Sequence, residues 1–475
     1  MRTSELTREI DESPAGPHVA AFFDLDRTLI AGFSALTFVA DGFRSGRLGA
    51  TDLVELLFAA TSFQLGTVGF SGFLSGTART LRGFSEEEFA AVGERIFNEE
   101  LAAEVYPEAR AIVDAHRRRG HTVAIVSSAT RYQVAPIARE LGIEHVLVSS
   151  LEVKDGVLTG ELVYPLCYGE GKAVAARGLT AELGLDLTQS WFYTDSEEDL
   201  PLLEVVGKPR PTNPSRNLAT IAARRKWPTQ TFTSRGFPGA EQMLRTGLAI
   251  GSIVPSFLLG LPAAALSGNW QQAVNIASST WGEVGTALAG LEVHVRGEEN
   301  VWARRPAVFI FNHQSAIDML VICKLLRRDF VGIGKQEIKK NPIFGPLMTL
   351  AGTVFIDRFQ HEKAIQALRP AIDALRHGLS LAIAPEGTRS TTPHPGPFKK
   401  GAFFMAMEAG VPIVPIVLRN TIDALPKNWL VVRPTTIDVD VLPPIETRNW
   451  QRQDLDRHMA ETHALYEEAL RTTWD

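Results

Sequence analysis

Two widely separated groups of residues carry the side chains of two different chemistries. In the first, Asp24-Leu25-Asp26-Arg27-Thr28, two carboxylates stand two residues apart after an apolar run. In the second, His313-Gln314-Ser315-Ala316-Ile317-Asp318, a histidine precedes a carboxylate, again after an apolar run. Paired carboxylates suit phosphoryl transfer at Mg²⁺, and an imidazole with a carboxylate partner suits acyl transfer to an alcohol. The sequence therefore predicts an enzyme with two active sites.

The first group predicts a phosphatase. If the strand ends at Asp24, Asp26 lies in the following turn, so Asp24 can attack phosphorus while Asp26 protonates the leaving group and later activates water. Other polar residues follow further predicted strands and helices and complete the expected site. They are Thr28 and Ser127 for the phosphate oxygens, Lys172 for their charge, and Asp195 for Mg²⁺.

Residues 19–213 resemble the haloacid dehalogenase-like phosphatases, specifically the phosphoserine phosphatase-like branch. The resemblance rests on the order of Asp24-x-Asp26-x-Thr28, Ser127, Lys172 and Asp195-Ser196-Glu197-Glu198-Asp199. It implies a nucleophilic Asp24, a general acid/base Asp26, and Mg²⁺ held by Asp24, the backbone carbonyl of Asp26 and Asp195. It also implies that Asp199 orients Lys172 or a metal-bound water. Thr194 and Glu198 stand where glycine and asparagine are usual, which leaves the substrate open.

The second group predicts an acyltransferase. Five residues correspond to about 140° around an ideal helix, so His313 and Asp318 can meet only if His313 precedes a helix that contains Asp318. Asp318 would then fix the imidazole tautomer, leaving the other ring nitrogen free to take a proton from a hydroxyl. No serine or cysteine nucleophile is needed, because the acceptor alcohol can attack a thioester directly.

Residues 291–444 resemble the glycerolipid acyltransferases, most closely the 1-acylglycerol-3-phosphate acyltransferases. Besides the His313 segment, the resemblance rests on Gly352–Arg358, Pro385–Arg389 and Val411–Pro415. It implies a lysophosphatidate-like lipid acceptor and acyl-CoA or acyl-carrier protein as the donor. His313 would be the base and Asp318 its partner. The implied acceptor-binding residues are Lys335, Arg358, Glu386, Gly387, Thr388 and Arg389, with arginines suited to phosphate by their bidentate geometry.

Short apolar runs alternate with helical patterns and predict an α/β fold. Val19–Phe23, Thr122–Val126 and Trp191–Tyr193 are typical of buried parallel strands, which indicates a doubly wound, Rossmann-like sheet. A second α/β series begins near Leu291. The expected domains are a disordered lead-in at 1–18, a phosphatase domain at 19–215 with a helical cap at about 30–104, a linker at 216–245, a helical hairpin at 246–290, and an acyltransferase domain at 291–475.

The hairpin is predicted to attach to a membrane. Thr246–Gly282 contains no charged residue, and Gly247–Gly268 is about long enough to cross a bilayer. A single crossing would place the two active sites on opposite sides of the membrane. A kinked or re-entrant hairpin is therefore expected, with both catalytic domains on the cytosolic face of the cytoplasmic membrane. A hairpin buried in a soluble domain remains the alternative.

Bulk properties narrow the remaining choices. The 475 residues predict two to four domains, and a net charge of −6 gives no basic field for nucleic acid. Cys167 and Cys323 match no zinc spacing and indicate no disulfide framework. Two functional alternatives stay open. The phosphatase-like domain is non-catalytic and binds a regulator, or it dephosphorylates a lipid phosphate.

Overall fold

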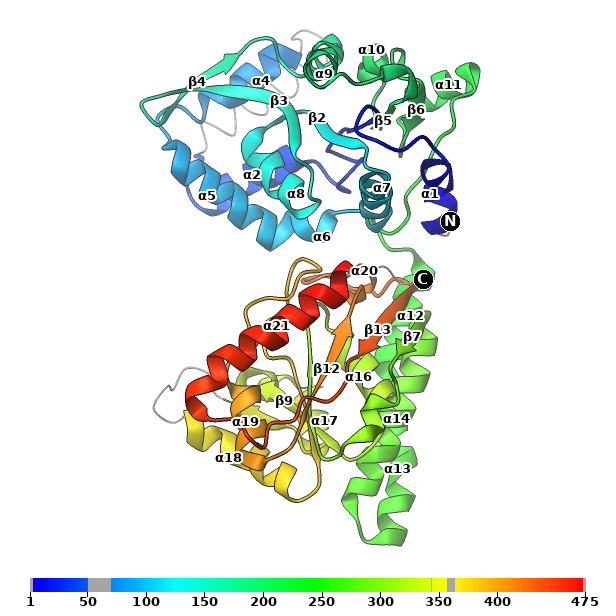
Figure 1. Ribbon diagram of the computed structural model, residues 1–475, viewed down its shortest axis with the longest axis vertical. Helices are drawn as coiled ribbons and strands as arrows, with labels where there is room; N and C mark the ends of the chain where they lie inside the picture. Colours follow the sequence, from blue (N-terminus) through cyan, green and yellow to red (C-terminus); the bar gives the residue numbers. More distant parts are fainter. Residues whose placement is uncertain (1–2, 50–69, 343, 357–363, 473–475) are drawn as a thin grey trace. The chain divides into compact units, whose positions relative to one another are not determined.

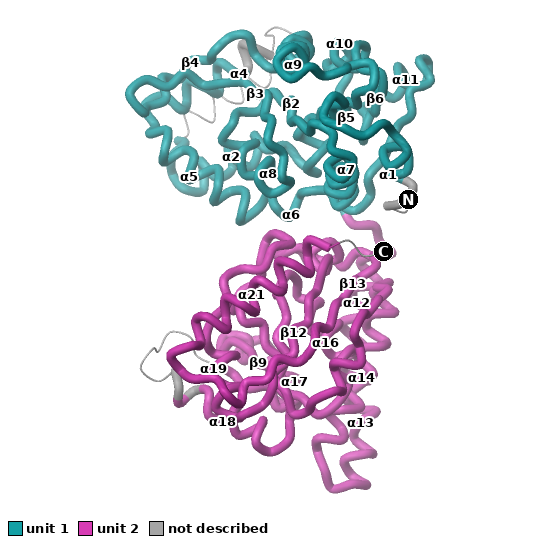
Figure 2. Tube along the Cα trace, viewed as in Figure 1, with its two compact units in different colours: residues 1–237 teal, residues 238–475 magenta. Residues whose placement is uncertain are grey.

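Two separate β-sheets form the centres of two structural units, residues 1–237 and 238–475 (Figures 1 and 2). The computed structural model describes residues 3–49, 70–342, 344–356 and 364–472. In each unit helices pack on both faces of the sheet, so the predicted α/β class is confirmed.

The sheet of the first unit has six strands in the order β4-β3-β2-β1-β5-β6. All neighbouring pairs are parallel except β3 and β4. The strands are β1 (Ala20–Phe23), β2 (Thr122–Thr130), β3 (His145–Lys154), β4 (Val157–Val163), β5 (Trp191–Thr194) and β6 (Lys208–Pro211). Strand β1 is therefore central. It hydrogen-bonds to β2, which carries Ser127, and to β5, which precedes Asp195.

The central strand is buried on both faces, as its unbroken apolar sequence predicts. Ala21 and Phe23 belong to one core and Ala20 and Phe22 to the other, because successive side chains of a strand point to opposite sides. The first core is covered mainly by α7 (Pro107–Arg118) and α8 (Arg131–Glu140). The second is covered by α9 (Glu170–Leu183), α10 (Leu200–Leu203) and α11 (Arg216–Arg225).

A helical segment is inserted between β1 and β2, where a cap was expected. Its described helices are α2 (Ser34–Arg44), α4 (Phe70–Arg79), α5 (Glu86–Ile96), a π-helix (Phe97–Leu101) and α6 (Ala102–Glu104). Phe89 and Ala78 pack with Tyr132, Leu151 and Leu158 in a small core of their own. The cap therefore rests on α8 and on the β3–β4 hairpin.

Two segments differ from the sequence prediction. The lead-in expected to be disordered contains α1 (Thr3–Asp11), whose Leu6 and Ile10 are buried in the first core. The expected linker at 216–245 begins with α11, whose Leu218 is fully buried. Both helices are short and strongly polar, so only a few apolar side chains mark the face that packs.

The sheet of the second unit has seven strands in the order β10-β9-β11-β8-β12-β13-β7, and only β12 and β13 pair in an antiparallel manner. The strands are β7 (Leu291–Arg296), β8 (Val308–Phe311), β9 (Phe330–Lys335), β10 (Val354–Ile356), β11 (Ser380–Ile383), β12 (Ile413–Leu418) and β13 (Thr435–Val441). One face is covered by α16 (Asp318–Leu326) and α14 (Trp270–Ala289), and the other by α18 (Ala364–Arg376), α19 (Gly401–Ala409) and α21 (Leu455–Arg471). Shorter helices are α15 (Asn300–Ala303), α17 (Phe344–Leu350) and α20 (Thr421–Ala424).

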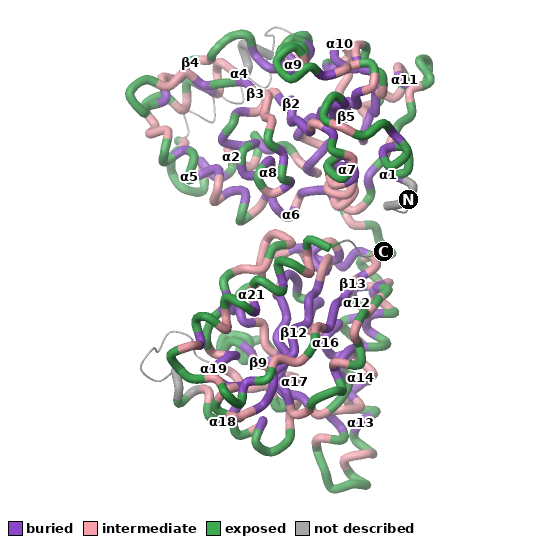
Figure 3. Tube along the Cα trace, in the orientation of Figure 1, coloured by how far each residue is buried: buried purple, intermediate pink, exposed green. Residues whose placement is uncertain are grey.

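A helical hairpin opens the second unit. Helices α12 (Ala240–Gly251) and α13 (Ile253–Ser267) run on from one another, and α13 turns back into α14 at Gly268. Among the described residues, Ala240–Ser267 is the one stretch that is long and apolar enough to cross a membrane, judged by length and composition alone. The far part of α13 is largely exposed (Figure 3).

Candidate functional sites

The first site lies at the carboxyl ends of β1 and β5. Phe23 is paired with Tyr193 and with Ile125 in the sheet register, and the Asp24 backbone N–H donates to the Tyr193 carbonyl at 2.9 Å. Asp24 thus stands directly beyond β1, facing the loop that carries Asp195. The carboxyl ends of parallel strands are the usual location of active sites in such sheets.

Lys172 connects two carboxylates in this site. Its Nζ donates to Asp24 Oδ1 at 2.7 Å and to Asp199 Oδ2 at 2.8 Å, and all three residues are buried. The two carboxylates raise the pKa of Lys172 although burial lowers it. Lys172 therefore stays protonated, and Asp199 holds it against Asp24, one of the two roles expected for Asp199.

Burial and crowding raise the pKa of the carboxylates. Burial, joined by the charges of Asp199 and Asp195, raises the pKa of Asp24 to about 7, even though Lys172 opposes the shift. Burial likewise raises the pKa of Asp195 to about 6. It also raises the pKa of Asp26, against the hydrogen bonds from Ser34. Buried carboxylates with raised pKa values in one place are typical of functional sites.

The charge balance of the site fits a divalent cation. Four carboxylates and two cations leave two uncompensated negative charges when all are ionised; the carboxylates are Asp24, Asp26, Asp195 and Asp199, and the cations are Arg27 and Lys172. Among the described residues, no three His, Cys, Asp or Glu side chains are grouped as a metal site. A cation bound by Asp24 and Asp195 would therefore take a backbone carbonyl as a further ligand, as predicted for Asp26; such oxygen ligands suit Mg²⁺.

The residues expected to contact phosphate differ in how they are engaged. The Thr28 hydroxyl oxygen is buried and has no hydrogen-bond partner among the described residues, so it is available to a phosphate oxygen. Ser127 is buried at the point where the pairing of β2 with β3 becomes irregular, and its hydroxyl accepts a hydrogen bond from Ala129 N–H at 3.2 Å. Thr28 follows β1, and Ser127 lies within β2, the strand that pairs with β1.

The second site lies beyond β8. The predicted contact is present: His313 Nδ1 lies 2.7 Å from Asp318 Oδ2. Helix α16 begins at Asp318, so His313 belongs to the turn between strand and helix. Asp318 is fully buried, whereas about a quarter of the His313 side chain is exposed. The imidazole is therefore anchored from below and open to a substrate.

Asp318 is held in place by the turn that it closes. Its Oδ2 also accepts hydrogen bonds from the backbone N–H groups of Gln314 at 2.8 Å and Ser315 at 2.9 Å. A carboxylate at the first position of a helix is further stabilised by the helix dipole. Next to an ionised Asp318, neutral His313 carries its proton on Nδ1 and leaves Nε2 as the acceptor.

Glu386 supports the same turn from the neighbouring strand. Because β8 and β11 pair with Ile310 opposite Ile383, Glu386 stands opposite His313. Its carboxylate accepts from the backbone N–H of His313 at 2.8 Å and of Gly396 at 3.0 Å. Burial raises the pKa of Glu386 to about 7, and the two N–H donors oppose the shift. Glu386 thus ties the histidine turn to the loop at 390–396.

The remaining predicted acceptor-binding residues differ in their surroundings. Gly387 has a φ of +78°, which favours glycine. Arg389 is half-buried and forms no ion pair with any described residue, so its charge is available to a ligand. Thr388 is exposed, and Lys335 is exposed at the end of β9. Arg358 lies outside the described residues.

Several contributors were not predicted. Arg27 pairs with Asp195 at 3.1 Å, although its place inside the first motif could have suggested a role. Ser34 N–H donates to Asp26 Oδ1 at 2.8 Å, and Gly396 binds Glu386. Neither residue stands in a recognisable motif, because loops bring them to the site. No local pattern predicts such contacts.

Comparisons with known proteins agree with this division into two sites. Residues 21–204 match the haloacid dehalogenase-like hydrolase family, and residues 292–419 match the acyltransferase family. The chain is 35% identical over 217 residues to a protein named probable phosphatase from Mycobacterium tuberculosis, covering 45% of this chain and 75% of that protein. It is 33% identical over 261 residues to a phosphoserine phosphatase of the same organism, covering 54% of this chain and 81% of that protein.

The C-terminal part has relatives of a different kind. It is 38% identical over 184 residues to a 1-acyl-sn-glycerol-3-phosphate acyltransferase from Cocos nucifera, which corresponds to 38% of this chain. The chain spans 59% of the length of that protein.

Proposed function

Because the chain belongs to the haloacid dehalogenase-like hydrolases and also carries an acyltransferase-family domain, we propose that it is a bifunctional enzyme. The C-terminal domain transfers an acyl group to 1-acylglycerol 3-phosphate and forms phosphatidate. The N-terminal domain hydrolyses a phosphomonoester with Mg²⁺. The observation that carries the proposal is the 2.7 Å contact of His313 Nδ1 with the buried carboxylate of Asp318, which leaves the other ring nitrogen free to act as a base.

The acyl transfer follows from the geometry of His313. Nε2 takes the proton of the acceptor hydroxyl while the alcohol oxygen attacks the thioester carbonyl, and the C–S bond then breaks to release the thiolate. Asp318 stabilises the imidazolium that forms. Glu386 holds the backbone of the histidine turn and is a positioning residue. Arg389, which forms no ion pair with a described residue, is suited to the acceptor phosphate, together with Lys335 and Arg358.

The phosphatase reaction follows from the arrangement around Asp24. The carboxylate of Asp24 attacks phosphorus, and Asp26 gives a proton to the departing alcohol oxygen. Asp26 then takes a proton from the water that hydrolyses the aspartyl phosphate. Thr28 and Ser127 bind phosphate oxygens, and Lys172 neutralises their charge. Asp24, Asp195 and the Asp26 carbonyl would hold Mg²⁺, which would stabilise the charge of the transferring phosphoryl group.

The hairpin of α12–α14 is proposed to attach the enzyme to the cytosolic face of a membrane. Its packing supports this, because most side chains that face inward are small or polar and many large apolar ones face outward. The buried residues of α12 and α13 are Thr246, Ala249, Ser252, Ile253, Ser256 and Gly260. The exposed ones include Leu248, Val254, Leu258, Leu259 and Leu266. Helices that associate within lipid use small residues at their contacts in this way.

The hairpin also contacts the helix that carries Asp318. A Cβ atom on Gly282 of α14 would lie 2.3 Å from the backbone nitrogen of Lys324 in α16, so the two helices pack closely at this point. Lipid attachment would therefore bring the site with His313 near a bilayer, where acylglycerol phosphates and long acyl chains partition.

Two assays test the proposal. Acyl transfer from labelled oleoyl-CoA to 1-oleoylglycerol 3-phosphate is measured in detergent for the wild type and His313→Ala. Phosphate release with Mg²⁺ is measured for the wild type and Asp24→Asn. Loss of one activity in each variant, with the other retained, supports two independent sites. Acyl transfer that persists in His313→Ala overturns the assignment of the base. Phosphate release that persists in Asp24→Asn, or that never occurs, leaves a binding role for the N-terminal domain.

A further inference from the structure

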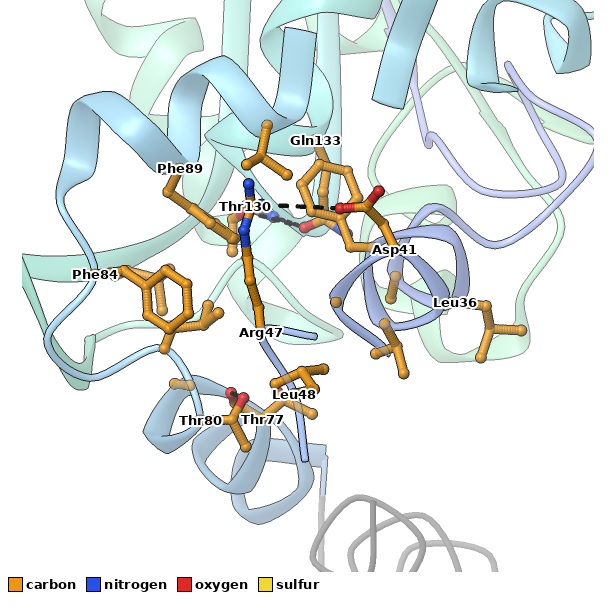
Figure 4. A pocket seen from close by; sticks show the side chains of 18 of the residues that line it. Leu36, Asp41, Arg47, Leu48, Thr77, Thr80, Phe84, Phe89, Thr130 and Gln133 are labelled. Atoms are coloured by element: carbon orange, nitrogen blue, oxygen red, sulfur yellow. Dashed lines mark hydrogen bonds and ion pairs between the residues drawn. The ribbon is translucent and has the colours of Figure 1, made fainter. Parts of the chain in front are cut away.

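The cap of the N-terminal unit contains a cavity of about 300 Å³ (Figure 4). Its volume is at the lower end of the range found for ligand pockets. Helices α2, α4 and α5 supply most of the wall, and the side chains are predominantly apolar. They include Leu36, Phe38, Val39, Ala78, Leu81 and Phe89. An apolar cavity of this kind favours a hydrocarbon ligand.

Hydrogen bonds connect the wall of the cavity to Asp26, the carboxylate assigned to the leaving group. Gln133 lines it and donates from Nε2 to the Ser34 hydroxyl at 3.2 Å. The Ser34 backbone N–H in turn donates to Asp26 Oδ1 at 2.8 Å. Because Asp26 protonates the departing oxygen, the alcohol portion of the substrate must lie next to Asp26. Two hydrogen bonds therefore link the wall of the cavity to Asp26, next to which the end of the substrate without the phosphate must lie.

The charged residues of the wall are committed to one another. Asp41 and Arg47 line the cavity, and Arg47 lies 3.9 Å from the Asp41 carboxylate. Asp41 also receives two hydrogen bonds of 2.8 Å from Arg95, and these contacts lower the pKa of Asp41. Among the described lining residues, neither charge is left over for an amino or carboxylate group of a small polar substrate.

Two exposed apolar side chains also stand at the start of α2. Leu36, on the first turn of α2, is 65% exposed and lines the cavity. Phe33, which precedes Ser34, is 51% exposed. Exposed large apolar side chains beside a polar catalytic centre indicate a ligand with an apolar part.

We propose that the cap cavity binds a single hydrocarbon chain, and that the N-terminal domain hydrolyses the phosphomonoester of a single-chain amphiphile. This inference rests on the proposed phosphatase function. Asp24 forms a bond to phosphorus, the bond from phosphorus to the alcohol oxygen breaks, and Asp26 protonates that oxygen. Water then cleaves the aspartyl phosphate, so the products are the amphiphilic alcohol and inorganic phosphate. One chain fills the cavity, which is too small to hold two side by side.

The test measures kcat/KM for n-alkyl phosphates from methyl to dodecyl with Mg²⁺ and the full chain in detergent. Burying one methylene contributes about 0.8 kcal/mol, or about fourfold in kcat/KM. We therefore expect a several-fold rise per methylene that levels off when the cavity is full. A parallel series of 1-acylglycerol 3-phosphates of matched chain length distinguishes a glycerolipid from a simple alkyl ester as the better source of the chain.

Two variants test the cavity itself. Ala78→Phe on α4 and Val39→Phe on α2 each place a phenyl ring in the cavity from a different helix. If one variant does not fold, the other can still be measured. Each is expected to lower the ratio of kcat/KM for long and short esters about tenfold or more. The matched control is Leu183→Phe, which adds the same ring on α9 at a residue that is 41% exposed and does not line the cavity. Its ratio should equal that of the wild type.

The outcomes separate the inference from the function on which it rests. If methyl phosphate is hydrolysed in an Asp24-dependent reaction and chain length has no effect, the cavity does not bind the chain although the phosphatase stands. If the control lowers the ratio as much as the filling variants do, the cavity assignment is also wrong. If no ester of either series is hydrolysed with Mg²⁺, the phosphatase function itself fails, and the inference with it.

Discussion

His313 Nδ1 lies 2.7 Å from Asp318 Oδ2 because helix α16 begins at Asp318 and not before. The same carboxylate oxygen accepts the backbone N–H groups of Gln314 and Ser315, so one atom fixes both the turn and the ring. The geometry makes the tautomer of His313 dependent on a single buried charge. A neutral side chain in place of Asp318 would preserve the shape and remove that dependence.

Asp318→Asn is therefore expected to lower kcat for acyl transfer by about 10²- to 10⁴-fold, the contribution typical of a positioned general base. Steady-state assays with oleoyl-CoA and 1-oleoylglycerol 3-phosphate measure it. Phosphate release by the same preparation serves as the control, since Asp318 and Asp24 belong to different units. A rate within threefold of the wild type would contradict the assigned role of Asp318.

The buried position of Lys172 predicts a loss of both activity and stability on substitution. Lys172→Met leaves Asp24 and Asp199 buried without their shared cation, and breaking such a pair costs about 3–5 kcal/mol. The cost should be largest at pH values above the Asp24 pKa of about 7, where that carboxylate is ionised, and should shrink as the pH falls and Asp24 takes up a proton. Thermal unfolding of the N-terminal unit at pH 8 and pH 5 measures it. An equal loss of stability at both pH values would speak against this charge arrangement.

The raised pKa values predict a pH dependence of Mg²⁺ activation. Asp24, with a pKa of about 7, and Asp195, with a pKa of about 6, must lose their protons before they can hold a cation. Protons and Mg²⁺ therefore compete, and the Mg²⁺ concentration for half-maximal phosphatase activity should rise as the pH falls from 8 to 6. Titrating Mg²⁺ at several pH values measures this. A constant half-activation concentration across that range would show that these carboxylates are not the ligands.

The central strands could be predicted because each is a continuous apolar run that ends directly before candidate catalytic residues. Val19–Phe23 and Ala307–Phe311 are unbroken apolar runs, and a strand buried on both faces needs such a run. The following polar residue, Asp24, must therefore lie at the carboxyl end of this buried strand. The geometry of His313 with Asp318 could be predicted for a similar reason, since the separation of five excludes a contact within one ideal helix.

Contacts that depend on sheet order and loops could not be predicted in the same way. Glu386 stands opposite His313 only because β11 is the neighbour of β8, and the sequence separation of the two residues carries no information about that pairing. Strands β7 and β13 mix polar with apolar residues, so they lack the continuous run that marked the others. Helix α1 was missed because only Leu6 and Ile10 mark its packed face.

Glu386 links the histidine turn to Gly396, so disturbing either end should reduce acyl transfer. In Glu386→Gln the amide oxygen can still accept from His313 N–H, but the amide nitrogen cannot accept from Gly396 N–H. In Gly396→Ala the added Cβ would lie 3.2 Å from Glu386 Oε2. We expect kcat to fall about tenfold in each, by analogy with the loss of one neutral-to-charged hydrogen bond. If the losses of activity in the two single variants add up in the double variant, the two substitutions do not act through the same contact between Glu386 and Gly396.

The large apolar side chains on the outside of the α12–α14 hairpin predict which substitutions release the enzyme from lipid. Leu258, Leu259 and Leu266 on α13 are 59%, 61% and 90% exposed, so replacing all three by serine should leave the hairpin folded and remove the three most exposed large apolar side chains of α13. Flotation with anionic phospholipid vesicles measures the change, and we expect most of the bound protein to become soluble. Acyl transfer to a short-chain acceptor in detergent should be retained, because α13 lies apart from His313 in the chain and in the fold.

Gly260→Leu is the matched comparison, since its Cβ would meet the Ala273 carbonyl oxygen at 2.4 Å and separate α13 from α14. That variant should lose thermal stability while keeping its apolar surface. Vesicle binding that survives the triple serine variant would place the attachment elsewhere in the chain.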